Sequence, residues 1–197
     1  MRKIILTVTV LAITLVSFNN FTTETYNADI NESIVEWAAS RTGKTHNGSV
    51  NIKDGMLTFE DGQLIGGDFT LNMTSIKVLD IPASSKMNTK LVDHLNSSDF
   101  FSTENYPTGK FMITGSESQN GKTLVKGNLT IKDISHDVSF LATIKNAGGA
   151  LEMTSDEFSI DRTKWDVKFR SGKFFDNLKD KLIYDDITIS VKVKATK

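Results

Sequence analysis

The chain contains 197 residues, with 23 Lys and Arg against 24 Asp and Glu and a formal net charge of −1. Its charged and hydrophobic shares, 24 % and 39 %, are those of an ordinary globular protein and exclude disorder as the main state. No stretch concentrates basic residues, so nucleic-acid binding is not expected. The chain has no cysteine, which excludes disulfide scaffolds, zinc ribbons and cysteine nucleophiles.

The N-terminus has the pattern of a targeting segment. Arg2 and Lys3 precede an apolar run from Ile4 to Phe18, which is shorter than the about 20 residues that span a bilayer. We therefore expect residues 1–20 to be a signal peptide and the protein to be periplasmic or secreted, without a stable membrane anchor. An uncleaved anchor is the alternative. Polar residues 21–32 predict a flexible leader, and residues 33–197 the folded domain.

From residue 33 onward, apolar residues alternate with polar ones, as in strands with one buried face. Asp-Gly or Asn-Gly between two such runs is typical of a tight hairpin turn. Turns are therefore predicted at Asp54-Gly55, Asp61-Gly62 and Asn120-Gly121, and a further chain reversal at 146–149. The first two turns lie close together and predict a three-strand meander. The whole pattern predicts about eight strands, mostly in sequential antiparallel pairs.

One segment has helical spacing instead. Met87, Leu91 and Leu95 are four residues apart, which predicts a short amphipathic helix over 85–96 with Ser84 or Ser85 as its N-cap. An all-β chain with one helix must protect its edge strands, and closing the sheet does this. The sequence thus predicts a closed or nearly closed antiparallel barrel, with a two-sheet sandwich as the alternative.

The search for reactive groups finds no catalytic motif. His46, His94 and His136 are far apart in the sequence and have no metal-ligand spacing, so neither a metal nor a cofactor is predicted. Lys86, Lys90 and His94 recur every four residues and form a basic stripe on the predicted helix. This stripe is either a solvated face or a contact for an anionic head group.

Aromatic residues suggest what a barrel could contain. A closed barrel of about eight strands has an interior large enough for one small apolar ligand. The candidates for lining that interior, or for filling the core, are Trp37, Phe69, Phe111, Phe140, Phe158 and Trp165.

Several motifs, in order along the chain, resemble the YceI-like family of secreted bacterial lipid-binding proteins. They are Val35-Glu36-Trp37, His94-Leu95-Asn96-Ser97-Ser98-Asp99-Phe100-Phe101, Tyr106-Pro107-Thr108-Gly109-Lys110-Phe111, Gly127-Asn128-Leu129-Thr130-Ile131-Lys132 and Phe158-Ser159-Ile160-Asp161-Arg162-Thr163-Lys164-Trp165. The resemblance covers about residues 33 to 195. It implies a lipocalin-like antiparallel barrel that holds a polyisoprenoid or another long-chain lipid, and it implies no catalytic residues. Asp133 stands where the family usually has a glycine.

Two classes of function follow. The first is a non-catalytic binding protein that carries or stores a long-chain apolar ligand, with no nucleic-acid partner; a homodimer is compatible with the sequence. The alternative is a secreted enzyme acting on an apolar substrate inside the barrel. For that enzyme, His94 and Asp99 are the first residues to test.

Overall fold

The computed structural model describes residues 21–197, so the predicted signal peptide lies outside the described residues. The described chain forms ten strands, one α-helix and two short 3₁₀ helices. These are β1 (Thr23–Ala28), β2 (Ile34–Arg41), β3 (Lys44–Glu60), β4 (Gln63–Val78), α1 (Lys86–Asn96), β5 (Thr108–Gln119), β6 (Lys122–Ile131), β7 (Ile134–Ala147), β8 (Ala150–Ser155), β9 (Phe158–Asp161), η1 (Arg162–Trp165), η2 (Lys179–Lys181) and β10 (Ile183–Thr196).

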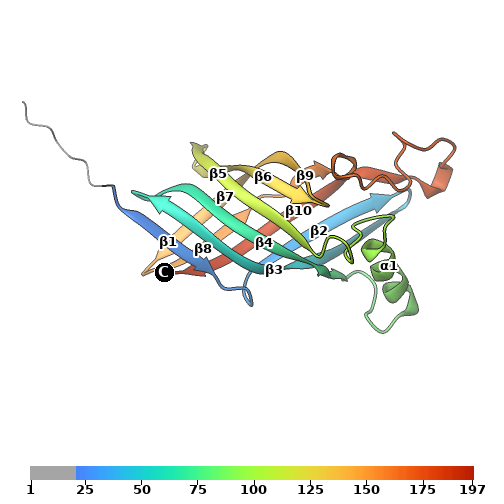
Figure 1. Ribbon diagram of the computed structural model, residues 1–197, viewed down its shortest axis with the longest axis horizontal. Coiled ribbons are helices and arrows are strands. Elements are labelled where there is room, and N and C mark those ends of the chain that lie inside the picture. The colour runs from blue at the N-terminus through green and yellow to red at the C-terminus, as the bar shows by residue number, and fades with distance from the viewer. Residues whose placement is uncertain (1–20) are drawn as a thin grey trace, which may run out of the picture.

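The sheet closes on itself as an elongated barrel, with its strands oblique to the long axis (Figure 1). All neighbouring strands are antiparallel, and β10 pairs with β2 on one side and with β8 on the other. β2 and β1 pair with successive stretches of β3, residues 44–51 and 56–60, so they share one position in the ring. β9 and β8 likewise share one side of β10. The predicted antiparallel barrel of about eight strand positions is therefore confirmed, and the sandwich alternative is wrong.

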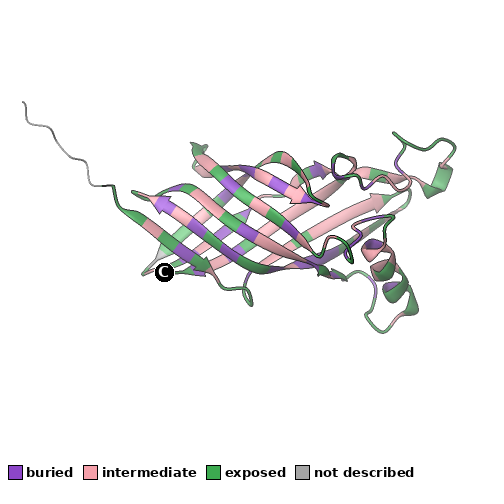
Figure 2. Cartoon of the chain, viewed as in Figure 1, coloured by how far each residue is buried: buried purple, intermediate pink, exposed green. Residues whose placement is uncertain are grey.

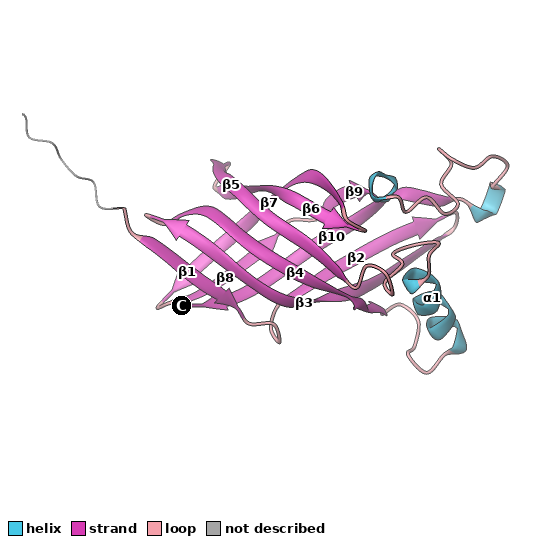
Figure 3. Cartoon of the chain, viewed as in Figure 1, coloured by secondary structure: helices cyan, strands magenta, loops and turns pink. Residues whose placement is uncertain are grey.

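The helices gather at one end of the barrel (Figure 3). The helix predicted over 85–96 is α1, and Ser85 caps it, because the Ser85 hydroxyl accepts a hydrogen bond of 3.2 Å from the Met87 amide. Asn88 is buried and donates its side-chain amide to the carbonyls of Val78 and Ile81, at 2.9 and 2.8 Å. These bonds attach the helix to the end of β4.

Two of the predicted tight turns are confirmed and one is wrong. Asp61-Gly62 and Asn120-Gly121 have positive φ at both residues, as their turns require. Asp54-Gly55 instead lies within β3, which pairs with β4 as one long hairpin rather than as part of a meander. A Cβ on Gly55 would lie 2.3 Å from a ring carbon of Phe69. Close packing, and not a turn, explains this glycine.

The segment predicted as a flexible leader contains a strand. Residues 23–28 form β1, which pairs with β3 and β10. Tyr26 is only 1 % exposed, packs edge-on against Phe59 at 5.6 Å between ring centroids, and accepts a hydrogen bond of 2.7 Å from Asn146. The sequence did not predict this strand because its residues are mostly polar and only one of them, Tyr26, is buried.

The two halves of the barrel interior are filled differently. At the β1 end, buried side chains pack against one another; they include Tyr26, Leu57, Phe59, Leu64 and Leu151. Buried residues alternate with intermediate or exposed ones along much of the strands, as in β6 (Figure 2). Toward the helical end, the inward side chains surround a cavity.

Candidate functional site

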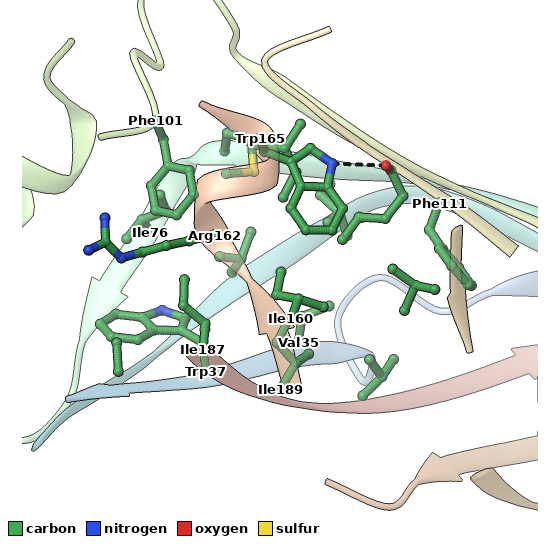
Figure 4. Close-up of a pocket in the computed structure, with 18 of the residues that line it drawn as sticks. Val35, Trp37, Ile76, Phe101, Phe111, Ile160, Arg162, Trp165, Ile187 and Ile189 are labelled. Atoms are coloured by element: carbon green, nitrogen blue, oxygen red, sulfur yellow. Dashed lines mark hydrogen bonds between the residues drawn. The ribbon is translucent and has the colours of Figure 1, made fainter. Parts of the chain in front are cut away.

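The cavity lies inside the barrel, and its wall is almost entirely apolar. The space that the centre of a water molecule can reach within it is about 150 Å³, roughly ten times what one buried water needs. Every strand except β1 contributes to the wall, together with α1 and η1. Phe100 and Phe101, which follow α1, and Val167, which follows η1, complete it. Figure 4 shows these side chains converging from several strands.

Strand alternation places these residues. On β2, Val35, Trp37 and Ala39 face the cavity, while Glu36 between them is exposed. Along β10, Ile187, Ile189, Val191 and Val193 also line it at every second position. A period of two is what one face of a strand provides. The alternation that predicted the strands therefore also produces the apolar wall.

All six aromatic residues singled out from the sequence lie in the cavity wall: Trp37, Phe69, Phe111, Phe140, Phe158 and Trp165. Phe140 and Phe158 stack, with ring centroids 4.6 Å apart and planes 13° apart. Trp165 donates its indole N–H to the Leu129 carbonyl at 3.1 Å, the dashed line in Figure 4. That the six residues contact a ligand stays a prediction.

Arg162 is the one charged residue in the cavity wall, and its guanidinium is directed at backbone carbonyls. Nε donates to the Tyr184 carbonyl at 3.1 Å, Nη1 to Val167 at 2.6 Å and Nη2 to Ile183 at 3.0 Å. Burial holds the pKa of Arg162 below its ordinary value, although the carboxylates of Asp185 and Asp161 act in the opposite direction. The side chain thus joins η1 to β10 through hydrogen bonds. It lies in the Phe158–Trp165 motif, but the sequence did not predict this role.

One buried hydrogen-bond donor in the cavity wall has no partner. Nε1 of Trp37 is buried and has no hydrogen-bond partner, the only such side-chain atom among residues 21–197. An unpaired buried donor costs about 1–3 kcal/mol. Since the other polar atoms of the wall are paired, apolar burial must supply most of the affinity for anything held there.

The head-group candidates lie outside the cavity. Lys86 and Lys90 are exposed on α1. His94 is half-buried, and its Nε2 lies 3.2 Å from a carboxylate oxygen of Asp99. Its ring contacts Phe100 edge-on at 4.8 Å, and Phe100 lines the cavity. None of the three lines the cavity itself, and their predicted role is untested.

The described residues contain neither a metal cluster nor a spanning helix. Within residues 21–197, no group of three or more His, Asp or Glu side chains is placed so that it could hold a metal ion. His46 lies 2.9 Å from Asp80, and His136 bonds the Lys164 carbonyl at 3.0 Å, so the three histidines stay separate. None of the helices in this part of the chain is long and apolar enough to cross a membrane.

Solved structures with little sequence identity share this fold. BcnA of Burkholderia cenocepacia is 20 % identical with a TM-score of 0.65, covering 86 % of this chain and 99 % of that one. A polyisoprenoid binding domain from Saccharophagus degradans is 9 % identical with a TM-score of 0.61, covering 87 % and 97 %. The Campylobacter jejuni YCEI protein is 18 % identical with a TM-score of 0.54, covering 100 % and 99 %.

Sequence comparison agrees with the fold. UPF0312 protein plu2095 of Photorhabdus laumondii is 30 % identical over 95 residues, which are 48 % of this chain and 46 % of that protein. The match thus spans about half the length of the curated relative. The family model described as "YceI-like domain" matches residues 26–195, nearly the whole described chain. The protein therefore belongs to the YceI-like domain family.

Proposed function

We propose that the barrel holds a long-chain apolar ligand, a polyisoprenoid or another lipid, in its cavity. The observation that carries the proposal is a cavity lined by inward side chains of nine strands, in which the single charged group, Arg162, has its donors directed at carbonyls. The polyisoprenoid binding domain of Saccharophagus degradans, which has the same fold, supports the choice of ligand class.

Apolar burial is sufficient to bind such a ligand. Each buried methylene contributes about 0.8 kcal/mol, so about 20 buried carbons would contribute on the order of 16 kcal/mol. Association and ordering cost about 4–15 kcal/mol. The surplus supports binding without a charged contact, and we therefore expect loose selectivity for the head group.

We infer a carrier or storage role outside the cytoplasm, without catalysis. The export signal predicted over 1–20 supports this location, and the separation of the three histidines argues against a catalytic cluster. The mass of the protein purified from its native host tests the export step. We expect the first 17–27 residues, roughly, to be missing; an intact N-terminus with membrane retention would mean an anchored protein.

The experiment that tests the ligand is direct extraction. The protein is purified from its host without detergent and extracted with chloroform and methanol, and the extract is analysed by mass spectrometry. We expect a long-chain apolar compound in near-stoichiometric amount. An extract free of lipid, from protein that also fails to bind an added apolar fluorescent probe, would refute the proposal.

A further inference from the structure

The segment that joins η1 to β10 lies at the end of the cavity. We define the 168–182 loop as this segment; its flanking residues Val167 and Ile183 both line the cavity. Arg162 donates to the carbonyls of both flanking residues, and the Ile183 amide donates to the Arg170 carbonyl at 3.0 Å. The base of the loop is therefore fastened, while its outer part, with η2, protrudes beyond the barrel at the end opposite the C-terminus (Figure 1).

Two adjacent phenylalanines are exposed on this loop. Phe174 and Phe175 are 50 % and 49 % exposed. The fully buried Ser171 holds them there, because its carbonyl accepts hydrogen bonds from both of their amides, at 3.1 and 3.0 Å. Tyr184, two residues after the loop, is also 49 % exposed. The hydrogen-bonded turn at Ser171 therefore keeps Phe174 and Phe175 exposed.

The loop is basic although the whole chain is slightly acidic. Residues 168–182 contain five Lys or Arg and two Asp, in a chain of net charge −1. Lys179 and Lys181 are exposed and take part in no ion pair among the described residues. Exposed Met87, between Lys86 and Lys90, lies on α1 at the same end of the barrel (Figure 1). Aromatic residues among lysines are typical of surfaces that lie in a membrane interface.

We propose that this end of the barrel docks on an anionic lipid bilayer, with Phe174 and Phe175 entering the interface and Lys179 and Lys181 facing the head groups. Charge complementarity favours a lipid surface over a second copy, which would present the same basic loop. Position also favours it, because the loop borders the end of the cavity and a ligand of the proposed class resides in membranes. In this respect the inference rests on the proposed function.

A single fluorescent label tests the docking, because the chain has no cysteine of its own. Phe175→Cys carries an environment-sensitive NBD group, which replaces one uncharged aromatic ring with another. Met112→Cys, 48 % exposed on the barrel wall, is the matched control site. We expect vesicles of phosphatidylcholine with phosphatidylglycerol to shift the emission to the blue at position 175 and not at 112. Pure phosphatidylcholine should give a much smaller shift.

Charge variants give the second arm of the test. Lys179→Glu with Lys181→Glu should weaken vesicle binding of the labelled protein by on the order of tenfold or more. Lys53→Glu with Lys145→Glu, the same charge change at exposed strand positions, should weaken it less. An unchanged emission at 175, or equal shifts at 175 and 112, overturns the inference. Extraction of the same protein before vesicles are added separates the two proposals, because a protein that carries lipid but does not dock refutes this inference alone.

Discussion

The indole of Trp37 lies against the backbone of Gly48, its cross-strand neighbour on β3. A Cβ on Gly48 would lie 2.5 Å from Cζ2 of Trp37 and 1.8 Å from the Lys77 carbonyl oxygen. Phe69 covers Gly55 and Phe111 covers Gly127 in the same manner. In each case the missing side chain lets an aromatic ring lie close to the wall, and all three rings line the cavity.

Gly48→Ala should therefore destabilise the protein. The new methyl group has no space between Trp37 and Lys77, and overpacking of this kind costs about 1–3 kcal/mol. Urea unfolding measures the loss. Gly66→Ala is the matched control, since the nearest atom to its Cβ would be 3.9 Å away, and we expect its free energy of unfolding to stay close to that of the wild type.

Arg162→Leu should be more damaging. It leaves the carbonyls of Val167, Ile183 and Tyr184 without their donor, and it leaves Asp185 with Lys173 as its remaining cationic partner. Breaking a buried charged contact costs about 3–5 kcal/mol. Arg41→Leu, at an exposed position, should change stability by less than about 0.5 kcal/mol. A small and equal effect of both variants in urea unfolding would show that Arg162 does not fasten η1 to β10.

Asp161 gives the stability a pH dependence. Burial raises its pKa, but hydrogen bonds from Lys173 at 2.6 Å and from the side chain and amide of Thr163 outweigh burial and lower the pKa to about 2. Because the folded pKa lies below the ordinary value of 3.8, this stabilisation is complete above about pH 4 and is lost as the pH falls toward 2.

Asp161→Asn should consequently lower the free energy of unfolding at neutral pH, and its difference from the wild type should shrink below about pH 4. Urea unfolding between pH 2 and 7 measures both quantities. Asp176→Asn, an exposed residue without an ion pair among the described residues, is the control and should follow the wild type throughout. A difference for Asp161→Asn that is constant with pH would contradict this assignment.

The fold was largely predictable from local patterns. Alternation identified most strands, four-residue spacing identified α1, and both Asp61-Gly62 and Asn120-Gly121 proved to be turns. The error at Asp54-Gly55 has a tertiary cause, since Phe69 lies across the strand from that glycine. A further turn, Lys132-Asp133, has positive φ at both residues without any glycine. Asp133 thus adopts the conformation that a glycine would readily supply.

The site was predictable only in part. The aromatic residues could be named because strands must point every second residue inward, and all six line the cavity. Two features of the site depend on contacts between segments far apart in the sequence and could not be predicted from local patterns. Arg162 donates to the carbonyls of Ile183 and Tyr184, and it reaches them only because β10 pairs with β9. The cavity exists because inward side chains of nine strands leave space between them toward the helical end, whereas Tyr26, Leu57 and Leu64 pack against one another at the β1 end and do not line it.

The enzyme alternative makes its own prediction about His94 and Asp99. If the protein is a carrier, His94→Ala and Asp99→Asn should retain the same extracted compound as the wild type, with some loss of stability for His94→Ala because its ring packs against Phe100 and Phe169. Mass spectrometry of the extracts measures this. Accumulation of a precursor in either variant, with its product in the wild type, would favour the enzyme.

β7 offers a matched pair of variants that tests whether the ligand occupies the barrel interior. Phe140 is 5 % exposed and lines the cavity, stacked on Phe158, whereas Thr143 is exposed on the outer face. Phe140→Glu places a carboxylate in the apolar wall, where an unpaired charge is costly and must draw in water. Thr143→Glu adds the same charge to the outside. Ala39→Phe, which fills the cavity without a charge, covers the case in which Phe140→Glu fails to fold.

The decisive measurement is the amount of apolar compound extracted per mole of each folded protein, with circular dichroism as the check on folding. If the ligand occupies the cavity, we expect a near-stoichiometric amount from the wild type and Thr143→Glu, and little or none from Phe140→Glu and Ala39→Phe. Equal amounts from all four folded proteins would show that the ligand binds somewhere other than the cavity.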